Sequence, residues 1–296
     1  MGTIKTEEEQ DALGTHEKAV SSHRTPKRDI PAELPAINLM GMRLHAVIEA
    51  QAIEHILAEL SAGHGGWVVT PNLDHLRRFT LDRQVRELYA TASLSLADGM
   101  PLIWAARLRG TPLPQRVPGS GLIWSLSAAA AAGGRSLYLL GGEPGSADDA
   151  AAILRSRYPN VRITGTDCPE MGFEQSESVM QSLIDRVVKA DPDIVYVALG
   201  SPKQEWLIGR IYQHLPRAWW IGVGISFSFV AGRVRRAPAW MQRAGLEWLH
   251  RLAQEPRRLA KRYLVQGLPF AVRLLTWAMF SRPNRGDSVT RRCEGC

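Results

Sequence analysis

Cysteine is scarce in this chain of 296 residues, and the scarcity excludes one class of protein. The three cysteines, Cys168, Cys293 and Cys296, are too few to build a disulfide framework. Cys293 and Cys296 have no second pair of possible metal ligands nearby, so we interpret this end of the sequence as a tail and not as a metal site. The first residues are acidic and lack an apolar core, which argues against a signal peptide. We therefore expect a reducing, cytoplasmic location.

Familiar nucleotide and metal motifs are absent too. No GxGxxG follows the first expected strand, which disfavours a dinucleotide-dependent oxidoreductase, and there is no Walker loop and no HExxH. Asp191-Pro192-Asp193 matches the DxD pattern with which many nucleotide-sugar enzymes hold a divalent metal. It precedes an expected strand at 194–199 and so falls at the amino edge of a sheet, where a turn explains it better. We expect no metal site and no cofactor.

Positive charge, by contrast, is in excess. The formal net charge is +7, which suits an anionic partner such as nucleic acid, acidic lipid or a nucleotide. Hydrophobic residues at 45% and charged residues at 22% are ordinary for a globular protein. Nine basic residues fall between Arg233 and Arg262, where only Glu247 and Glu255 oppose them. The last part of the chain is therefore a candidate surface for an anionic partner.

Strands and helices are expected to alternate from residue 37 to 232. The alternation predicts an α/β fold, a Rossmann-like, mostly parallel sheet with helices on both faces. Residues 1–36 are polar and almost free of aliphatic side chains, so we predict a disordered segment. Residues 233–296 are predicted to form a basic helical appendage and a tail. The expected strands lie at 67–70, 94–97, 136–140, 161–164, 194–199 and 218–223, after two short strands or one bent strand within 37–44.

The appendage combines basic and apolar patterns. Every fourth residue from Trp240 to Leu252 is apolar, which predicts a stripe on one helix that Pro256 should end or kink. Residues 264–280 are apolar but interrupted, and shorter than the roughly 20 apolar residues of a membrane span. We favour a helix in the membrane interface. A basic helix packed on the core and a nucleic-acid surface remain open alternatives.

Polar residues follow several expected strands at the edge where open α/β sheets bind ligands. Asp98-Gly99 follows 94–97, and Thr70 and Asn72 lie at the end of 67–70. On spacing alone, the favoured interpretation of these side chains is helix capping. Arg116 could clamp a phosphate, and a helix beginning at Gly119 and Ser120 could offer free backbone N–H groups. The loop that starts at Gly141-Gly142 could let a diphosphate approach the backbone, although a plain turn is the simpler interpretation.

Four short sequence blocks stand out together: Thr70-Pro71-Asn72, Ala97-Asp98-Gly99-Met100, Arg116-Val117-Pro118-Gly119-Ser120 and Gly200-Ser201-Pro202-Lys203-Gln204-Glu205. They resemble the signature blocks of the WecG/TagA/CpsF family and occur in the family's order. The similarity runs from about residue 37 to about residue 263. Members are bacterial glycosyltransferases that build lipid-linked precursors of surface polysaccharides.

The resemblance implies an inverting, metal-independent hexosyltransferase of exopolysaccharide or cell-surface polysaccharide biosynthesis. The donor would be a UDP-sugar and the acceptor a polyprenyl-diphosphate-linked sugar. The enzyme would be cytoplasmic and bound peripherally to the inner, anionic face of the cell membrane, with no nucleic-acid partner. A homo-oligomer is compatible with the sequence. The alternative is a non-catalytic, basic, Rossmann-like protein that binds a nucleotide or nucleic acid.

The same resemblance implies which residues form the site. Asp98 would be the general base, and Arg116 would contact the diphosphate or the acceptor's own phosphate. The family's tail block resembles Glu247-Trp248-x-x-Arg251-Leu252 and Glu255–Leu259, so appendage arginines are expected to reach the site. The other expected substrate-binding residues are Thr70, Asn72, Gly99, Gly119, Ser120, Gly141, Gly142, Gly200, Ser201, Lys203, Gln204, Arg251, Arg258 and Arg262.

Overall fold

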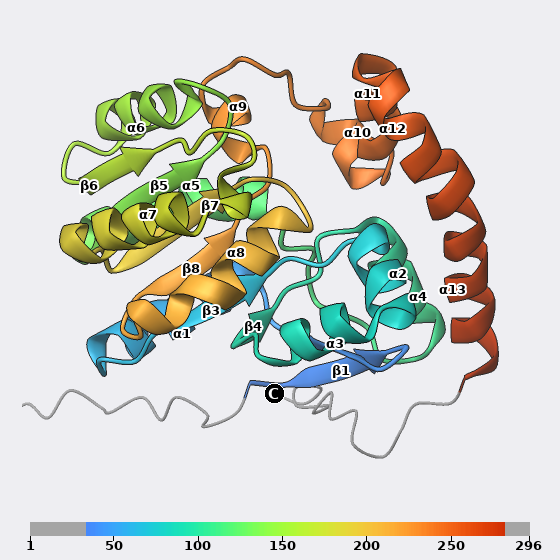
Figure 1. Ribbon diagram of the computed structural model, residues 1–296. Helices are drawn as coiled ribbons and strands as arrows, with labels where there is room; N and C mark the ends of the chain where they lie inside the picture. Colours follow the sequence, from blue (N-terminus) through green and yellow to red (C-terminus); the bar gives the residue numbers. More distant parts are fainter. Residues whose placement is uncertain (1–33, 282–296) are drawn as a thin grey trace, which may run out of the picture. The chain divides into compact units, whose positions relative to one another are not determined.

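A parallel β-sheet with helices on both faces forms the centre of the computed structural model (Figure 1), which describes residues 34–281. The strand order is β4-β3-β8-β7-β5-β6, and every neighbouring pair is parallel. The predicted α/β fold is therefore confirmed. The expectations for the N-terminal segment up to residue 33 and for Cys293 and Cys296 fall outside the described residues. The strands are β3 (Gly66–Val69), β4 (Leu94–Ser95), β5 (Ser136–Gly141), β6 (Arg162–Asp167), β7 (Ile194–Ala198) and β8 (Trp219–Gly222).

A separate hairpin precedes this sheet. β1 (Ala36–Leu39) pairs antiparallel with β2 (Met42–His45), so the stretch is two short strands and not one bent strand. The connecting residues Met40 and Gly41 have φ angles of 49° and 89°. Left-handed backbone of this kind suits the tight turn of a two-residue hairpin.

Helices follow the strands as the alternating pattern predicted. Strands β5, β7 and β8 are buried along their whole length because helices cover both faces of the sheet. The helices of this part are α1 (Glu49–Ser61), α2 (Leu73–Leu81), α3 (Arg83–Ala90), α4 (Met100–Leu108), α5 (Gly119–Ala132), α6 (Ser146–Arg157), α7 (Glu177–Ala190), α8 (Lys203–Ile211) and α9 (Ser226–Val230), with short turns η1 (Phe173–Gln175) and η2 (Tyr212–His214).

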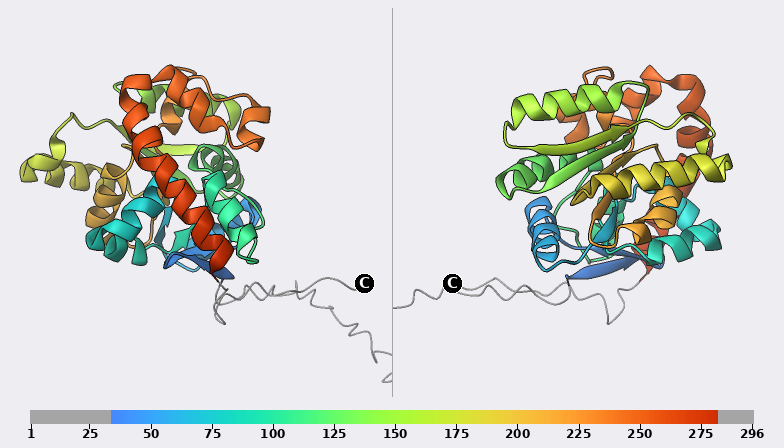
Figure 2. Two further views of the ribbon diagram at one scale, coloured as in Figure 1. Left: turned by 90° about the vertical axis from the view of Figure 1, so that its right-hand side faces the viewer. Right: turned by 60° about the vertical axis from the view of Figure 1, so that its left-hand side comes forward.

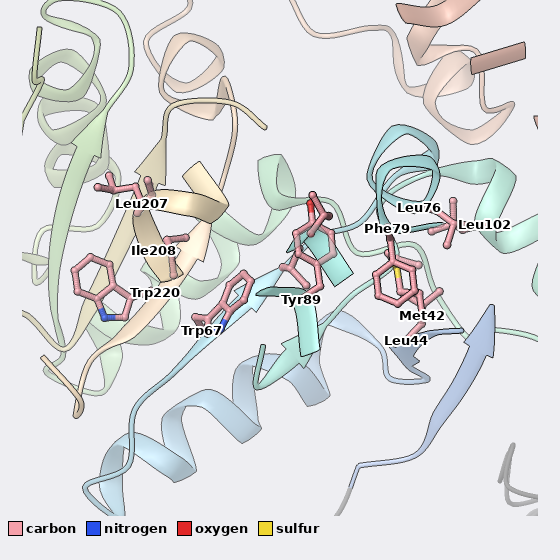
Figure 3. Close-up of a cluster of buried hydrophobic side chains, with 14 of the residues drawn as sticks. Met42, Leu44, Trp67, Leu76, Phe79, Tyr89, Leu102, Leu207, Ile208 and Trp220 are labelled. Atoms are coloured by element: carbon pink, nitrogen blue, oxygen red, sulfur yellow. The ribbon is translucent and has the colours of Figure 1, made fainter. Parts of the chain in front are cut away.

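Two hydrophobic clusters lie on opposite faces of the sheet, because successive strand residues point to opposite sides. Trp67 and Trp220 belong to one cluster, whereas Val68 and Ile221 belong to the other. Figure 3 shows the first cluster, in which the two tryptophans lie near side chains of α8 and α3 and the cluster continues to the β1–β2 hairpin. This packing fixes α2, α3 and α8 against the sheet, and α2 and α8 contribute to the site described below.

The appendage begins with two short helices, α10 (Ala239–Arg243) and α11 (Glu247–Gln254). The prediction of one striped helix through Trp240 and Leu252 is therefore wrong. The chain breaks at Gly245, where φ is +74° and the glycine lies tightly against α4: an added Cβ would come within 2.9 Å of Met100 and Trp104. Only glycine combines this backbone with so close an approach.

A long helix completes the described part of the appendage. It begins with Pro256 in its first turn and consists of α12 (Pro256–Ala260), the π-helical turn η3 (Lys261–Gly267) and α13 (Leu268–Phe280). The predicted break at Pro256 is present, because α11 ends at Gln254. The helix lies along α4 and α2 (Figures 1 and 2). Its inner face carries buried side chains such as Phe270 and Leu274. At 25 residues it is longer than the apolar segment expected. It is the one helix within residues 34–281 that is long and apolar enough to cross a membrane.

Candidate active site

The loops after β3 and β4 meet at the carboxyl edge of the sheet, around Asp98. The Asp98 N–H donates to the Pro71 carbonyl at 2.9 Å, and the Val117 N–H donates to the Ala97 carbonyl at 2.8 Å. Three chain segments that are distant in sequence are thus held together by backbone hydrogen bonds. Asp98 does not cap α4, because Gly99 is the N-cap residue and no side chain caps this helix. The carboxylate is left for chemistry.

The surroundings of Asp98 change its acidity. Burial, reinforced by the negative charge of Glu247, raises the pKa of Asp98 to about 6. The positive charges of Arg116, His75 and Arg236 oppose this rise without cancelling it. A carboxylate with this pKa is ionised at neutral pH and still basic enough to accept a proton from a hydroxyl in a transition state.

Arg116 joins this loop to the appendage. Its Nη1 donates to Glu247 Oε2 at 3.0 Å, and both side chains are mostly buried. Glu247 is the first residue of α11, so the appendage supplies a charged group directly beside the candidate base. The appendage is therefore part of the site.

Neutral hydrogen-bonding side chains surround the same edge. Asn72 caps α2, its Oδ1 accepting from the N–H groups of Asp74 and His75. Its backbone also abuts Gly99, where an added Cβ would lie 3.3 Å from Asn72 Cα. The capping interpretation of Asn72 is confirmed, and the amide nitrogen Nδ2 remains for a ligand.

Thr70, Gly119 and the end of β8 come together next to this group. A Cβ added at Gly119 would lie 3.1 Å from the Gly222 carbonyl oxygen and 3.4 Å from Thr70 Oγ1. Gly119 and Ser120 are the first two residues of α5, so their N–H groups precede the first intrahelical bonds and can serve a ligand. Gln204, in α8, reaches the same edge and accepts from the Gly224 N–H at 2.9 Å.

The expected glycines of β5 and β7 form a second part of the same edge. The Gly142 N–H donates to the Ala198 carbonyl, and an added Cβ at Gly141 would lie 2.8 Å from Leu199. Gly200 and Ser201 follow directly. Strands β5 and β7 are neighbours in the sheet. The chain leaves β5 for β6 toward one edge of the sheet, and it leaves β7 for β8 toward the opposite edge. Such a reversal of direction is where open α/β sheets bind nucleotides.

Two expected residues face other partners. Lys203 forms an ion pair with Glu174 and lines an apolar pocket of about 530 Å³ between α3, α7 and α8. Arg258 is more than half exposed and forms an ion pair with Glu255, three residues earlier. Neither cation lies in an ion pair with the residues around Asp98.

The other appendage arginines lie nearer to the site. Arg262 forms an ion pair with Asp74, at the start of α2, at 3.2 Å. The Nε atoms of Arg236, Arg251 and Arg262 are buried and have no hydrogen-bond partner among residues 34–281. Of these three, Arg236 acts on the pKa of Asp98. Unpartnered guanidinium atoms of this kind are suited to an anionic ligand.

The sequence alone assigned no role to four ionisable residues of this region: His75, Glu205, Arg236 and Glu247. His75 stands three residues after the Asn72 cap, at the position from which a side chain reaches back to the cap. That spacing from Asn72 was the one sequence signal that could have pointed to His75. Glu205 and Glu247 belong to conspicuous blocks, but their partners are 130 and 131 residues distant in the chain.

The DxD pattern lies at the amino edge, as predicted. Asp193 accepts hydrogen bonds from the Ser136 N–H and hydroxyl and from Arg135, so it fastens the start of β7 to the start of β5. Within residues 34–281, no three His, Cys, Asp or Glu side chains are grouped as metal ligands.

Comparison with protein families agrees with the geometry. Residues 37–284 match the sequence model of the glycosyl transferase WecG/TagA/CpsF family. The match covers far more than half of the chain and includes both the sheet and the appendage. It disfavours the alternative of a non-catalytic binding protein. The chain therefore belongs to the WecG/TagA/CpsF family of glycosyltransferases, enzymes that transfer sugars.

Proposed function

We propose that this glycosyltransferase moves a hexose from a UDP-sugar to a polyprenyl-diphosphate-linked sugar, with inversion at the anomeric carbon. The product would be a lipid-linked intermediate of exopolysaccharide or cell-surface polysaccharide biosynthesis. The observation that carries the proposal is Asp98, a carboxylate with a pKa of about 6 at the carboxyl edge of the sheet. It lies among groups that suit sugar hydroxyls and phosphates.

The reaction requires a base on the acceptor. The acceptor's hydroxyl oxygen attacks the anomeric carbon, the bond from that carbon to the diphosphate oxygen breaks, and UDP leaves with the electron pair. Asp98 takes the hydroxyl proton as the new glycosidic bond forms, which is a task for a carboxylate with a pKa near the working pH. A single displacement of this kind inverts the anomeric carbon.

The leaving diphosphate needs its charge neutralised. Arg116 and Arg236 are both close enough to Asp98 to act on its pKa, and the Nε of Arg236 is buried without a partner in the described chain. Together with the N-terminus of α5, these cations supply the positive charge that a metal provides in other transferases. This is the support for a metal-independent reaction.

The acceptor lipid places the enzyme at a membrane. The long helix of the appendage presents an outward row of exposed apolar side chains at helical spacing: Leu264, Val265, Leu268, Val272 and Met279. Exposed basic residues flank this row: Arg257, Lys261 and Arg273. Because the inner face of the helix packs on α4 and α2, we propose that the helix lies in the membrane interface on the cytoplasmic side.

The test is a donor screen with purified protein. UDP-N-acetylmannosamine, its uronic acid and UDP-glucose would each be offered with a short-chain polyprenyl-diphosphate sugar. We expect UDP release coupled to formation of a longer lipid-linked saccharide with one donor. UDP release without glycosidic product, or no turnover with any UDP-sugar, would contradict the proposal.

A further inference from the structure

A chain of polar contacts that is buried at its centre and partly buried at both ends connects two of the expected sugar-binding residues. In the loop after β8, the Gly224 N–H donates to Gln204 Oε1 at 2.9 Å, and Gln204 Nε2 donates to Glu205 Oε1 at 2.8 Å. The same carboxylate oxygen lies 3.3 Å from His75 Nε2, and His75 Nδ1 lies 2.9 Å from Asn72 Oδ1. Asn72 and Gln204 thus stand at two ends of one network that crosses from α2 to α8.

Burial of the centre of this network costs free energy. Glu205 is 2% exposed and His75 is 6% exposed. Burial alone would raise the pKa of Glu205, but hydrogen bonds from His75 and Gln204 hold it below its ordinary value. The carboxylate is therefore charged in the interior, where an unpaired charge would be strongly destabilising.

The network also determines what the two amides can offer a ligand. Gln204 has used its carbonyl oxygen on Gly224 and one N–H on Glu205, which leaves one N–H. Asn72 has used its carbonyl oxygen on the start of α2, which leaves its amide nitrogen. Both residues are therefore fixed as donors. Each amide would lose this assignment if it could rotate, because the two ends of an amide are nearly equal in size.

We propose that Glu205, acting through His75 and Gln204, is a positioning residue that holds Asn72 and Gln204 with their N–H groups toward the substrate. The inference rests on the proposed transferase function. It implies that the substrate group bound between Asn72 and Gln204 is a hydrogen-bond acceptor, such as a sugar hydroxyl oxygen or an amide carbonyl. Asn72, at one end of the network, abuts Gly99, the residue after the candidate base. The network would therefore also hold the sugar close to Asp98.

The experiment compares Glu205→Ala and Glu205→Gln with the full-length enzyme. Glu205→Ala removes the acceptor for Gln204 Nε2 and the partner of His75 Nε2, so Gln204 keeps only its bond from the Gly224 N–H and the His75 ring beside Asn72 is no longer held from α8. We expect kcat/KM for the UDP-sugar to fall between about 10-fold and about 100-fold, since a misplacement of about 1 Å can cost 10²-fold. The dissociation constant of UDP alone should change less than twofold. Glu205→Gln keeps an oxygen in place and should recover most of the lost kcat/KM.

A double-mutant cycle separates positioning from plain stability. If Glu205 acts in part through Gln204, then Glu205→Ala should lower kcat/KM by a clearly smaller factor in a Gln204→Ala background than in the unmodified enzyme. Glu177→Ala is the control. It removes a carboxylate of α7 that forms an ion pair with Arg210, a residue of α8 that lies outside this network. It should leave kcat/KM unchanged. Thermal melting of every variant confirms that folded protein is compared.

Two results would overturn the inference. In one, Glu205→Ala lowers the melting temperature while folded enzyme keeps normal kcat/KM, which would make Glu205 a structural residue only. In the other, the effects of Glu205→Ala and Gln204→Ala on kcat/KM multiply fully, which would show that they act independently. Failure of the proposed function itself looks different, because the unmodified enzyme would then transfer no sugar from any UDP-sugar.

Discussion

Arg116 Nη1 lies 3.0 Å from Glu247 Oε2, and this contact joins the loop beside the candidate base to the first residue of α11. The two residues are 131 positions apart in the chain. Both act on Asp98, with opposite signs: Glu247 raises its pKa and Arg116 lowers it. The position of the appendage is thereby coupled to the chemistry of the base. A substrate phosphate that binds Arg116 would compete with Glu247 for the same guanidinium.

The first prediction concerns docking of the appendage. Arg116→Ala and Glu247→Ala should each loosen the segment from residue 233 to 281, because each leaves a partly buried charge without its partner. A double-mutant cycle on the free energy of unfolding should give a coupling of about 0.5–3 kcal/mol, the range for residues in contact. Hydrogen exchange measured over α11 reports the loosening directly. Additive effects would mean that the contact does not hold the appendage.

The second prediction is the pH dependence of transfer. The base must be ionised, so kcat/KM should rise with pH through about 6, the pKa of Asp98 in the free enzyme. Glu247→Gln removes a negative charge and releases Arg116, and both changes favour the ionised form. The rising limb of the profile should therefore move to lower pH in this variant and to higher pH in Arg116→Ala. Movement in the opposite directions would contradict the electrostatic assignment.

Local patterns in the sequence were sufficient to predict much of the fold. The apolar runs predicted all six parallel strands to within a few residues, a helix ends just before Pro256 as expected, and the strand ends placed Asp98 and Asn72 at one edge. Periodicity failed in the appendage, where Trp240 and Leu252 fall on different helices. The break at Gly245 depends on its tight packing against Met100 and Trp104, which no local pattern encodes.

The charged partners of the site were harder to predict for the same reason. Glu205 meets His75, and Glu247 meets Arg116, only after the sheet and the appendage have assembled. A sequence shows which side chains are ionisable, but which of them become partners depends on three-dimensional packing. The resemblance to a known family supplied the roles of Asp98 and Arg116, which composition and spacing did not decide.

The third prediction tests the membrane-facing row of the long helix. Replacing Val265, Leu268 and Val272 together by serine should lower binding to anionic vesicles about tenfold or more, because each apolar side chain would contribute on the order of 1 kcal/mol when partly inserted. Co-sedimentation with the vesicles measures the loss. Leu81→Ser is the control, since Leu81 is equally exposed but lies on α2. Equal binding by the triple variant and the control would exclude this face.

The fourth prediction is that transfer survives a chelator. Excess EDTA should leave the rate unchanged, because arginines are proposed to neutralise the diphosphate. Asp193→Ala should lower stability by about 1–3 kcal/mol, since it leaves the Ser136 N–H and hydroxyl without their acceptor, yet folded enzyme should turn over normally. Activity that disappears with EDTA and returns with Mg²⁺ or Mn²⁺ would refute the metal-independent mechanism.

The fifth prediction concerns the stability of the site. Because the pKa of Asp98 is raised in the folded state, ionised Asp98 opposes folding, and this cost appears as pH rises from about 4 to about 6. Asp98→Asn should therefore raise the melting temperature at pH 7 to 8. The difference from the unmodified enzyme should shrink as the pH falls toward about 3, where the aspartic acid is mostly neutral in both states. A variant that melts lower at pH 7 would contradict the raised pKa.

The central claim is that Asp98 removes the proton from the acceptor, and one measurement tests it most directly. Single-turnover transfer from the UDP-sugar to the polyprenyl-diphosphate sugar is compared between Asp98→Asn and the unmodified enzyme, with UDP affinity measured in parallel. The account predicts a rate lower by roughly 10²–10⁴-fold, as for loss of a general base, with UDP affinity preserved. A rate within a fewfold of the unmodified enzyme would show that another group accepts the proton.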